Sequence, residues 1–138
     1  MKEHLEKRIF YIIEMETNGW AWWSTWRNVW TKVPYSATSC EKKWVGKEQF
    51  LKAGYTYSWN VRKNQFKRMS HNIINEMYIS DYLPVETVVD IEDKFENVFK
   101  DQYHHEPIKR WSGCWECYTL DLKSNFSSVE TFIKEHIG

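Results

Sequence analysis

The dipeptide Asn18-Gly19 is the feature that most narrows the folds open to this chain. It separates two stretches rich in β-branched and aromatic residues, 8–17 and 20–31. Asn-Gly supplies the two positive φ angles of a type I′ turn, which joins antiparallel strands through a two-residue loop. The sequence therefore predicts that the chain opens with a β-hairpin.

A two-residue loop would also fix the partners across the hairpin, because the residue numbers of every antiparallel pair then have the same sum. Met15 would face Trp22, and Tyr11 would face Trp26, on one buried side. Ile13 belongs to the same side. The competing interpretation is a helix over residues 20–30, in which Trp23, Trp26 and Trp30 follow a helical period.

Hydrophobic periodicity predicts the remaining elements. The first is a helical turn at 47–53, followed by a strand at 55–61, for which a helix is the alternative. Helices at 63–80 and 85–103 come next, and then a strand within 111–123. A C-terminal helix, which begins at a Ser127/Glu130 capping box, ends the chain. This order lacks the βαβ alternation of a parallel sheet.

These elements predict an α+β fold. We expect an N-terminal β-hairpin in a small antiparallel or mixed sheet, with two longer helices and a short C-terminal helix packed on one side of it. No repeat, linker or change in composition divides the chain, so residues 1–138 are expected to form a single globular domain.

Charge and cysteine content indicate the compartment. Nineteen basic and nineteen acidic side chains cancel, so no overall field attracts the chain to nucleic acid or to a membrane. The apolar run at residues 9–13 is too short for a secretory leader or a membrane span. Three cysteines, an odd and low number, favour reduced thiols. We expect a soluble, cytoplasmic protein with no membrane partner.

Cys114 and Cys117 form a CxxC motif, which could build a zinc site with His104 and Cys40. On a regular strand, however, the thiols of Cys114 and Cys117 would point to opposite faces. We therefore expect no metal, and we expect no other cofactor.

Catalytic motifs are lacking. The chain has no phosphate-binding glycine loop and no hydrolase, metalloprotease or kinase signature. The acid-x-Lys strings at 92–94 and 121–123 resemble half of a nuclease site but are short enough to arise by chance. The acidic stripe of Glu86, Asp90 and Asp93 is typical of a solvated helix face. An enzyme with catalytic residues outside known motifs remains the less favoured class.

Aromatic residues make up 17% of the chain, with nine Trp, eight Tyr and seven Phe. Two basic-aromatic clusters contain the candidate binding residues: Tyr55, Tyr57, Trp59, Arg62, Lys63, Lys67 and Arg68, and then Lys109, Arg110 and Trp111. Trp, Tyr and Arg dominate protein interfaces. The leading hypothesis is therefore a non-enzymatic inhibitor, adaptor or regulator that binds a protein partner. A binder of single-stranded nucleic acid or of a nucleotide is the alternative, because rings beside cations also suit stacked bases and phosphates.

Overall fold

The computed structural model describes residues 7–17, 20–24, 29–31, 40–44, 47–68, 71–105 and 116–137, and it describes the three segments between 20 and 44 by their backbone alone. Within these residues, β1 (Lys7–Thr17) organises the main sheet. This sheet has the order β6-β1-β5-β8, formed with β5 (Gln49–Thr56), β6 (His71–Ile79) and β8 (Cys117–Tyr118). The short β7 (Leu83–Pro84) pairs with the start of β1, and all of these pairings are antiparallel.

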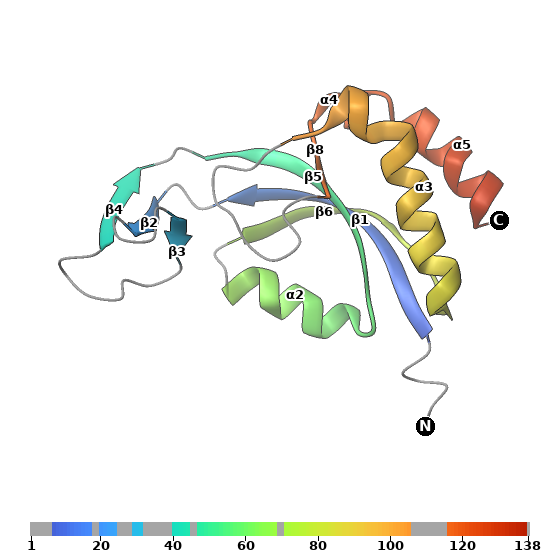
Figure 1. The fold of residues 1–138 in the computed structure, drawn as a ribbon, viewed down its shortest axis with the longest axis horizontal. Coiled ribbons are helices and arrows are strands. Elements are labelled where there is room, and N and C mark those ends of the chain that lie inside the picture. The colour runs from blue at the N-terminus through green and yellow to red at the C-terminus, as the bar shows by residue number, and fades with distance from the viewer. Residues whose placement is uncertain are drawn as a thin grey trace.

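A second sheet is inserted between β1 and β5. It consists of β2 (Trp20–Ser24), β3 (Val29–Thr31) and β4 (Cys40–Trp44) in the order β3-β2-β4. Figure 1 shows it beyond the end of the main sheet, past the ends of β1 and β5. Strands thus lie on both sides of Asn18-Gly19, as predicted, and the competing helix over residues 20–30 is wrong.

The predicted partners within this N-terminal strand pair are also wrong. Met15, expected opposite Trp22, lies between Phe50 of β5 and Ile73 of β6. β2 pairs instead with β3 and β4. Both edges of β1 are therefore occupied by strands that come later in the chain.

The apolar run of residues 9–13 explains this arrangement. Phe10 and Ile12 are as fully buried as Tyr11 and Ile13, although they point to the opposite face. A strand that is apolar on both faces needs a cover on each side, so it takes a central position. The prediction considered one face of the strand only.

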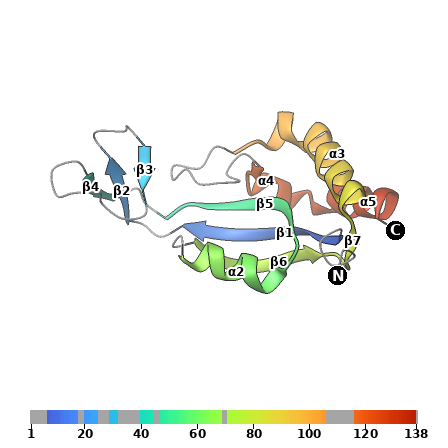
Figure 2. The same ribbon diagram turned by 60° about the horizontal axis from the view of Figure 1, so that its bottom comes forward.

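Helices cover both faces of the main sheet, which corrects the expectation that they pack on one side. The helix α2 (Trp59–Arg68) covers the face of Tyr11, Ile13 and Met15. The helices α3 (Val85–Tyr103), α4 (Asp121–Ser124) and α5 (Phe126–His136) cover the face of Phe10 and Ile12. Figures 1 and 2 show the resulting three layers.

The α+β class is confirmed, and so are the helix at 85–103 and the C-terminal helix. No side chain caps the start of α5, however, so the Ser127 capping box is wrong. The strand expected within 111–123 is limited in the described part to β8, because residues 121–124 form α4 and bury Leu122 as part of a helix. No helix of the described residues has the length and apolar character needed to cross a membrane.

The middle of the chain differs most from the prediction. Residues 49–56 form a strand rather than a helical turn, and the helix expected at 63–80 divides into α2 and β6. Two register shifts between β1 and β6 explain why the apolar residues of β6 mimic a helical period. Irregular pairing of this kind moves apolar side chains out of strict alternation.

Candidate binding face

The helix α2 is attached to the sheet through few side chains. Phe66 is its only fully buried residue, and Trp59 packs beside it at the edge of the same core. Both rings contact Tyr11 of β1, with centroid separations of 5.0 Å for Trp59 and 6.2 Å for Phe66. The rest of the helix surface is therefore left facing outward, where Asn60, Val61 and Gln65 are exposed.

The cations of α2 surround this attachment. Arg62 donates from Nε to the Tyr11 hydroxyl at 3.2 Å, and its guanidinium lies 4.3 Å from the centre of the Phe66 ring. Lys63 Nζ lies 6.0 Å from the Trp59 ring centre. Lys67 and Arg68 are exposed at the end of the helix. We call Tyr57, Trp59, Arg62, Lys63, Lys67 and Arg68 the α2 face.

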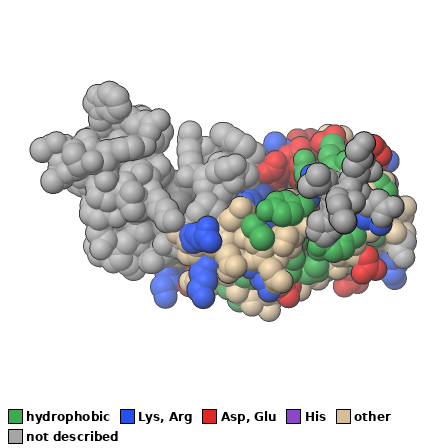
Figure 3. Space-filling view, turned by 90° about the horizontal axis from the view of Figure 1, so that it is seen from below, with side chains coloured by type: hydrophobic (Ala, Val, Ile, Leu, Met, Phe, Trp, Pro, Cys, Tyr) green, Lys and Arg blue, Asp and Glu red, His purple; other side chains and the backbone are tan. Residues whose placement is uncertain are grey.

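None of these four cations lies within ion-pair distance of a carboxylate of the described residues. The contrast with other lysines is clear, because five of them lie 2.8–4.0 Å from a carboxylate: Lys47, Lys52, Lys94, Lys100 and Lys123. The cations of α2 are thus not neutralised locally. Figure 3 shows Lys and Arg side chains gathered over the end of α2 that lies nearer the grey atoms.

Charge is segregated between the two helical layers. The helix α2 has four cations and no carboxylate, whereas α3 has six carboxylates and two lysines. The formal net charge of zero therefore conceals a basic layer and an acidic layer on opposite faces of the sheet. Local fields of this kind attract ligands of opposite charge even when the whole molecule is neutral.

No protein family, no curated protein and no solved structure matches the chain.

The structure separates Tyr55 from the rest of its predicted cluster. Tyr55 lies opposite Phe10 in the β1–β5 register, which places it on the α3 side of the sheet. Burial raises the pKa of its phenol, and the nearby charge of Glu92 raises it further. Tyr57 lies at the turn into α2, where it is exposed and its carbonyl accepts a hydrogen bond from the Tyr82 hydroxyl at 3.2 Å.

The other candidate residues fall largely outside the described part of the chain. Lys109, Arg110, Trp111 and Cys114 lie outside it, and only the backbone of Cys40 is described. Cys117 is buried in the α2-side core, whereas His104 is exposed and bridges to Tyr118, a residue of the α3-side core. Among described residues, no group of His, Cys, Asp and Glu is suited to hold a metal ion.

A buried lysine of β5 lies close to partly buried carboxylates, and the sequence did not predict this group of charges. Lys52 is 2% exposed, and its Nζ lies 3.3 Å from Glu116 and donates to the Ala53 carbonyl at 3.1 Å. Burial raises the pKa of the neighbouring Glu92 to about 7, and the charge of Glu116 adds to the effect while Lys52 opposes it. The sequence pattern that could have predicted the buried lysine is the alternation of Phe50, Lys52 and Gly54. In a strand these residues point to the same face, which places Lys52 among inward-facing residues.

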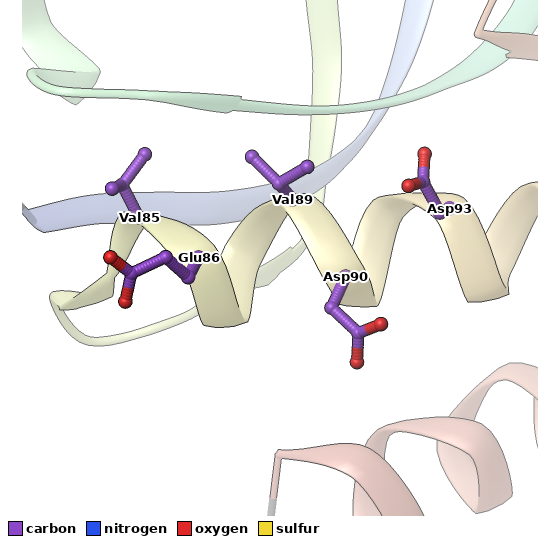
Figure 4. A pocket seen from close by; sticks show the side chains of 5 residues that line it. All are labelled: Val85, Glu86, Val89, Asp90 and Asp93. Atoms are coloured by element: carbon purple, nitrogen blue, oxygen red, sulfur yellow. The ribbon is translucent and has the colours of Figure 1, made fainter.

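The acidic stripe of α3 borders an open groove. Figure 4 shows Val85 and Val89 beside Glu86, Asp90 and Asp93, which line a cavity of about 380 Å³. The three carboxylates are exposed, and Asp90 pairs with Lys94 at 2.8 Å. The stripe is therefore the solvated face that its sequence predicts.

The second acid-x-Lys string, at 121–123, lies on the helix α4 and not on the strand that was predicted for it.

Proposed function

We propose that the protein is a non-enzymatic binding protein, of the inhibitor, adaptor or regulator type, that docks an acidic segment of a protein partner on its α2 face. The observation that carries this proposal is the set of four cations on α2 without a carboxylate partner among the described residues. Complementary charge steers encounter and selects partners. Two of these cations are Arg, and Trp59 and Tyr57 lie beside them; Arg, Trp and Tyr are the residue types that dominate interface energies.

The state of the rings favours a protein over single-stranded nucleic acid. Base stacking needs an open ring face. Trp59 instead packs on Tyr11 and donates its Nε1 hydrogen to Glu76, while Tyr55 lies on the opposite side of the sheet. Of the three aromatic residues in the predicted cluster, Tyr57 alone is exposed beside the basic helix. A nucleic-acid or nucleotide binder therefore stays the alternative.

The cytoplasmic compartment is part of the same proposal. It is supported by the odd, low number of cysteines, which suits a reducing environment. An acidic partner segment would then belong to another cytoplasmic protein.

Fluorescence anisotropy with short polyanions tests the proposal. The probes are labelled octaglutamate and a thymidine oligonucleotide of the same charge, each titrated with the full chain. Reversing two charges, Lys63→Glu with Lys67→Glu, should abolish octaglutamate binding, because the field over α2 is then cancelled. The matched control is Lys94→Glu, which reverses a cation in the α3 layer, and it should bind as the wild type does.

Three outcomes would contradict the proposal. Octaglutamate could fail to bind, or Lys94→Glu could weaken binding as much as the α2 variant does. The oligonucleotide could also bind far more tightly, with a logarithmic salt slope of about −0.7 for each phosphate neutralised, which would favour the nucleic-acid alternative.

A further inference from the structure

Three contacts fix the orientation of the Arg62 guanidinium. Nε donates to the Tyr11 hydroxyl at 3.2 Å, and Nη1 donates to Gln65 Oε1 at 3.0 Å. The plane also lies over the Phe66 ring, at 4.3 Å from its centre. A long side chain that is held at both ends of its charged group has little rotamer freedom left to lose on binding.

The partner of Arg62 in this arrangement is a core residue. Tyr11 is 1% exposed, and its ring contacts those of Trp59 and Phe66. It also lies against Gly54 of β5, where a Cβ atom would come within 2.7 Å of the Tyr11 hydroxyl oxygen. Glycine at this position therefore leaves the space in which the hydroxyl reaches Arg62.

The contacts leave part of the guanidinium open. Nη2 has no protein partner among the described residues, and Nη1 has a second hydrogen besides the one that it donates to Gln65, so these two nitrogens can still bind one ligand together. Arg62 is half-buried, and no described carboxylate pairs with it. A guanidinium edge of this kind matches the two oxygens of a carboxylate, which a lysine ammonium does not.

We propose that Arg62 is the specificity-determining residue of the α2 face, where it binds one carboxylate of an Asp or Glu side chain in the partner, and that Tyr11 and Gly54 position it. The inference rests on the proposed function and adds which cation selects the ligand. Lys63, Lys67 and Arg68 supply attraction without fixed geometry, because none has a hydrogen bond to the described residues that would orient it.

Nuclear magnetic resonance titration with octaglutamate tests this assignment, with the side-chain Nε–Hε signals of the arginines as the readout. The Arg62 signal should move on titration, and Arg62→Lys should weaken binding about tenfold, the loss expected when a charge-assisted bidentate contact is removed. The matched control is Arg68→Lys, the same chemical change on the same helix, which should alter affinity less than about twofold.

Tyr11→Phe keeps the ring and removes the hydroxyl, so it should weaken binding about threefold while the amide spectrum stays that of a folded chain.

The outcomes separate this inference from the proposed function. If octaglutamate moves the amide signals of α2 but Arg62→Lys and Arg68→Lys weaken binding equally, Arg62 is not the specificity-determining residue and the docking face stands. If no signal of α2 moves, both proposals fail. If a thymidine oligonucleotide moves the Arg62 signal at lower concentration than octaglutamate does, phosphate rather than carboxylate is the ligand.

Discussion

Tyr11 connects the core of the molecule with its candidate binding face. The sequence places Tyr11 correctly among buried residues, and it places Arg62 correctly beside other cations. The hydrogen bond between the two joins residues 51 positions apart. No local pattern can reveal such a contact, because it depends on how β1 and α2 meet in the folded chain.

Gly54 should tolerate no larger residue. In Gly54→Ala the new Cβ would lie 2.7 Å from the Tyr11 hydroxyl, and the ring cannot move aside because Trp59 and Phe66 hold it. We expect a loss of about 1–3 kcal/mol in the free energy of unfolding, the usual cost of overpacking a core. Urea denaturation measures it.

Tyr11→Phe provides the control for this prediction, since it removes the atom nearest to the new Cβ. Gly54→Ala should therefore cost less in the Tyr11→Phe background than in the wild type, as a double-mutant cycle would show. Equal costs in the two backgrounds would mean that the hydroxyl is not what excludes a side chain here.

Glu92 should make stability depend on pH. Its pKa rises from 4.5 to about 7 on folding, because burial and the charge of Glu116 disfavour its ionised form. Between these two values the unfolded chain releases a proton that the folded chain keeps, so stability falls as pH rises through this window. At pH 8, Glu92→Gln should be more stable than the wild type by on the order of 1–2 kcal/mol, after allowance for solvent screening.

Denaturation across pH 4 to pH 8 measures this slope. Glu86→Gln is the matched control, because it neutralises an exposed carboxylate on the same helix. A slope that persists in Glu92→Gln, or that disappears in Glu86→Gln, would contradict the assignment to Glu92.

At the scale of elements, prediction succeeds where the signal is local. The bounds of α3 are those its helical period predicts, because Val88, Ile91, Phe95 and Phe99 repeat on one buried face. β5 and β6 were misassigned because their pairing partner β1 lies far away in the chain, and that pairing outweighs local propensity. The fold brings the candidate cluster together in part, since its cations are contiguous on α2 while Tyr55 lies on the other face of the sheet.

Phe95 should be the residue on which the α3 layer depends most. Its ring contacts four others, from β1, α3, β8 and α5: Phe10, Phe99, Tyr118 and Phe132. Phe95→Ala should lower the free energy of unfolding by about 3–5 kcal/mol. Val98→Ala on the exposed side of α3 should change it by less than about 0.5 kcal/mol, and a similar loss in both variants would contradict this role for Phe95.

The helix α4 should be held by an ion pair that acts in the opposite pH direction to Glu92. Burial raises the pKa of Glu14, but hydrogen bonds from Asn75 and Lys123, with the charge of Lys123, outweigh it and leave the pKa below its ordinary value. The stability from this group is present at neutral pH and is lost as pH falls through the lowered pKa. Lys123→Met should cost on the order of 1 kcal/mol at pH 7 and less at pH 3, and an equal cost at both values would contradict the pair.

At the scale of the whole molecule, net charge was a misleading guide. A balance of nineteen basic and nineteen acidic groups says nothing of where they lie. The fold places the cations of α2 and the carboxylates of α3 on opposite faces of one sheet, an arrangement that composition does not reveal. Two faces of opposite charge let one small chain present a basic surface without a basic composition.

Affinity capture from a nuclease-treated native lysate tests the central claim most directly. The full chain, its Lys63→Glu/Lys67→Glu variant and its Lys94→Glu variant would each be immobilised at equal loading, and bound proteins quantified. The account predicts a protein that the wild type and Lys94→Glu retain and that the α2 variant loses. Two results would contradict it. One is recovery of the same proteins on all three immobilised chains, and the other is recovery of proteins only from a parallel lysate that was not treated with nuclease.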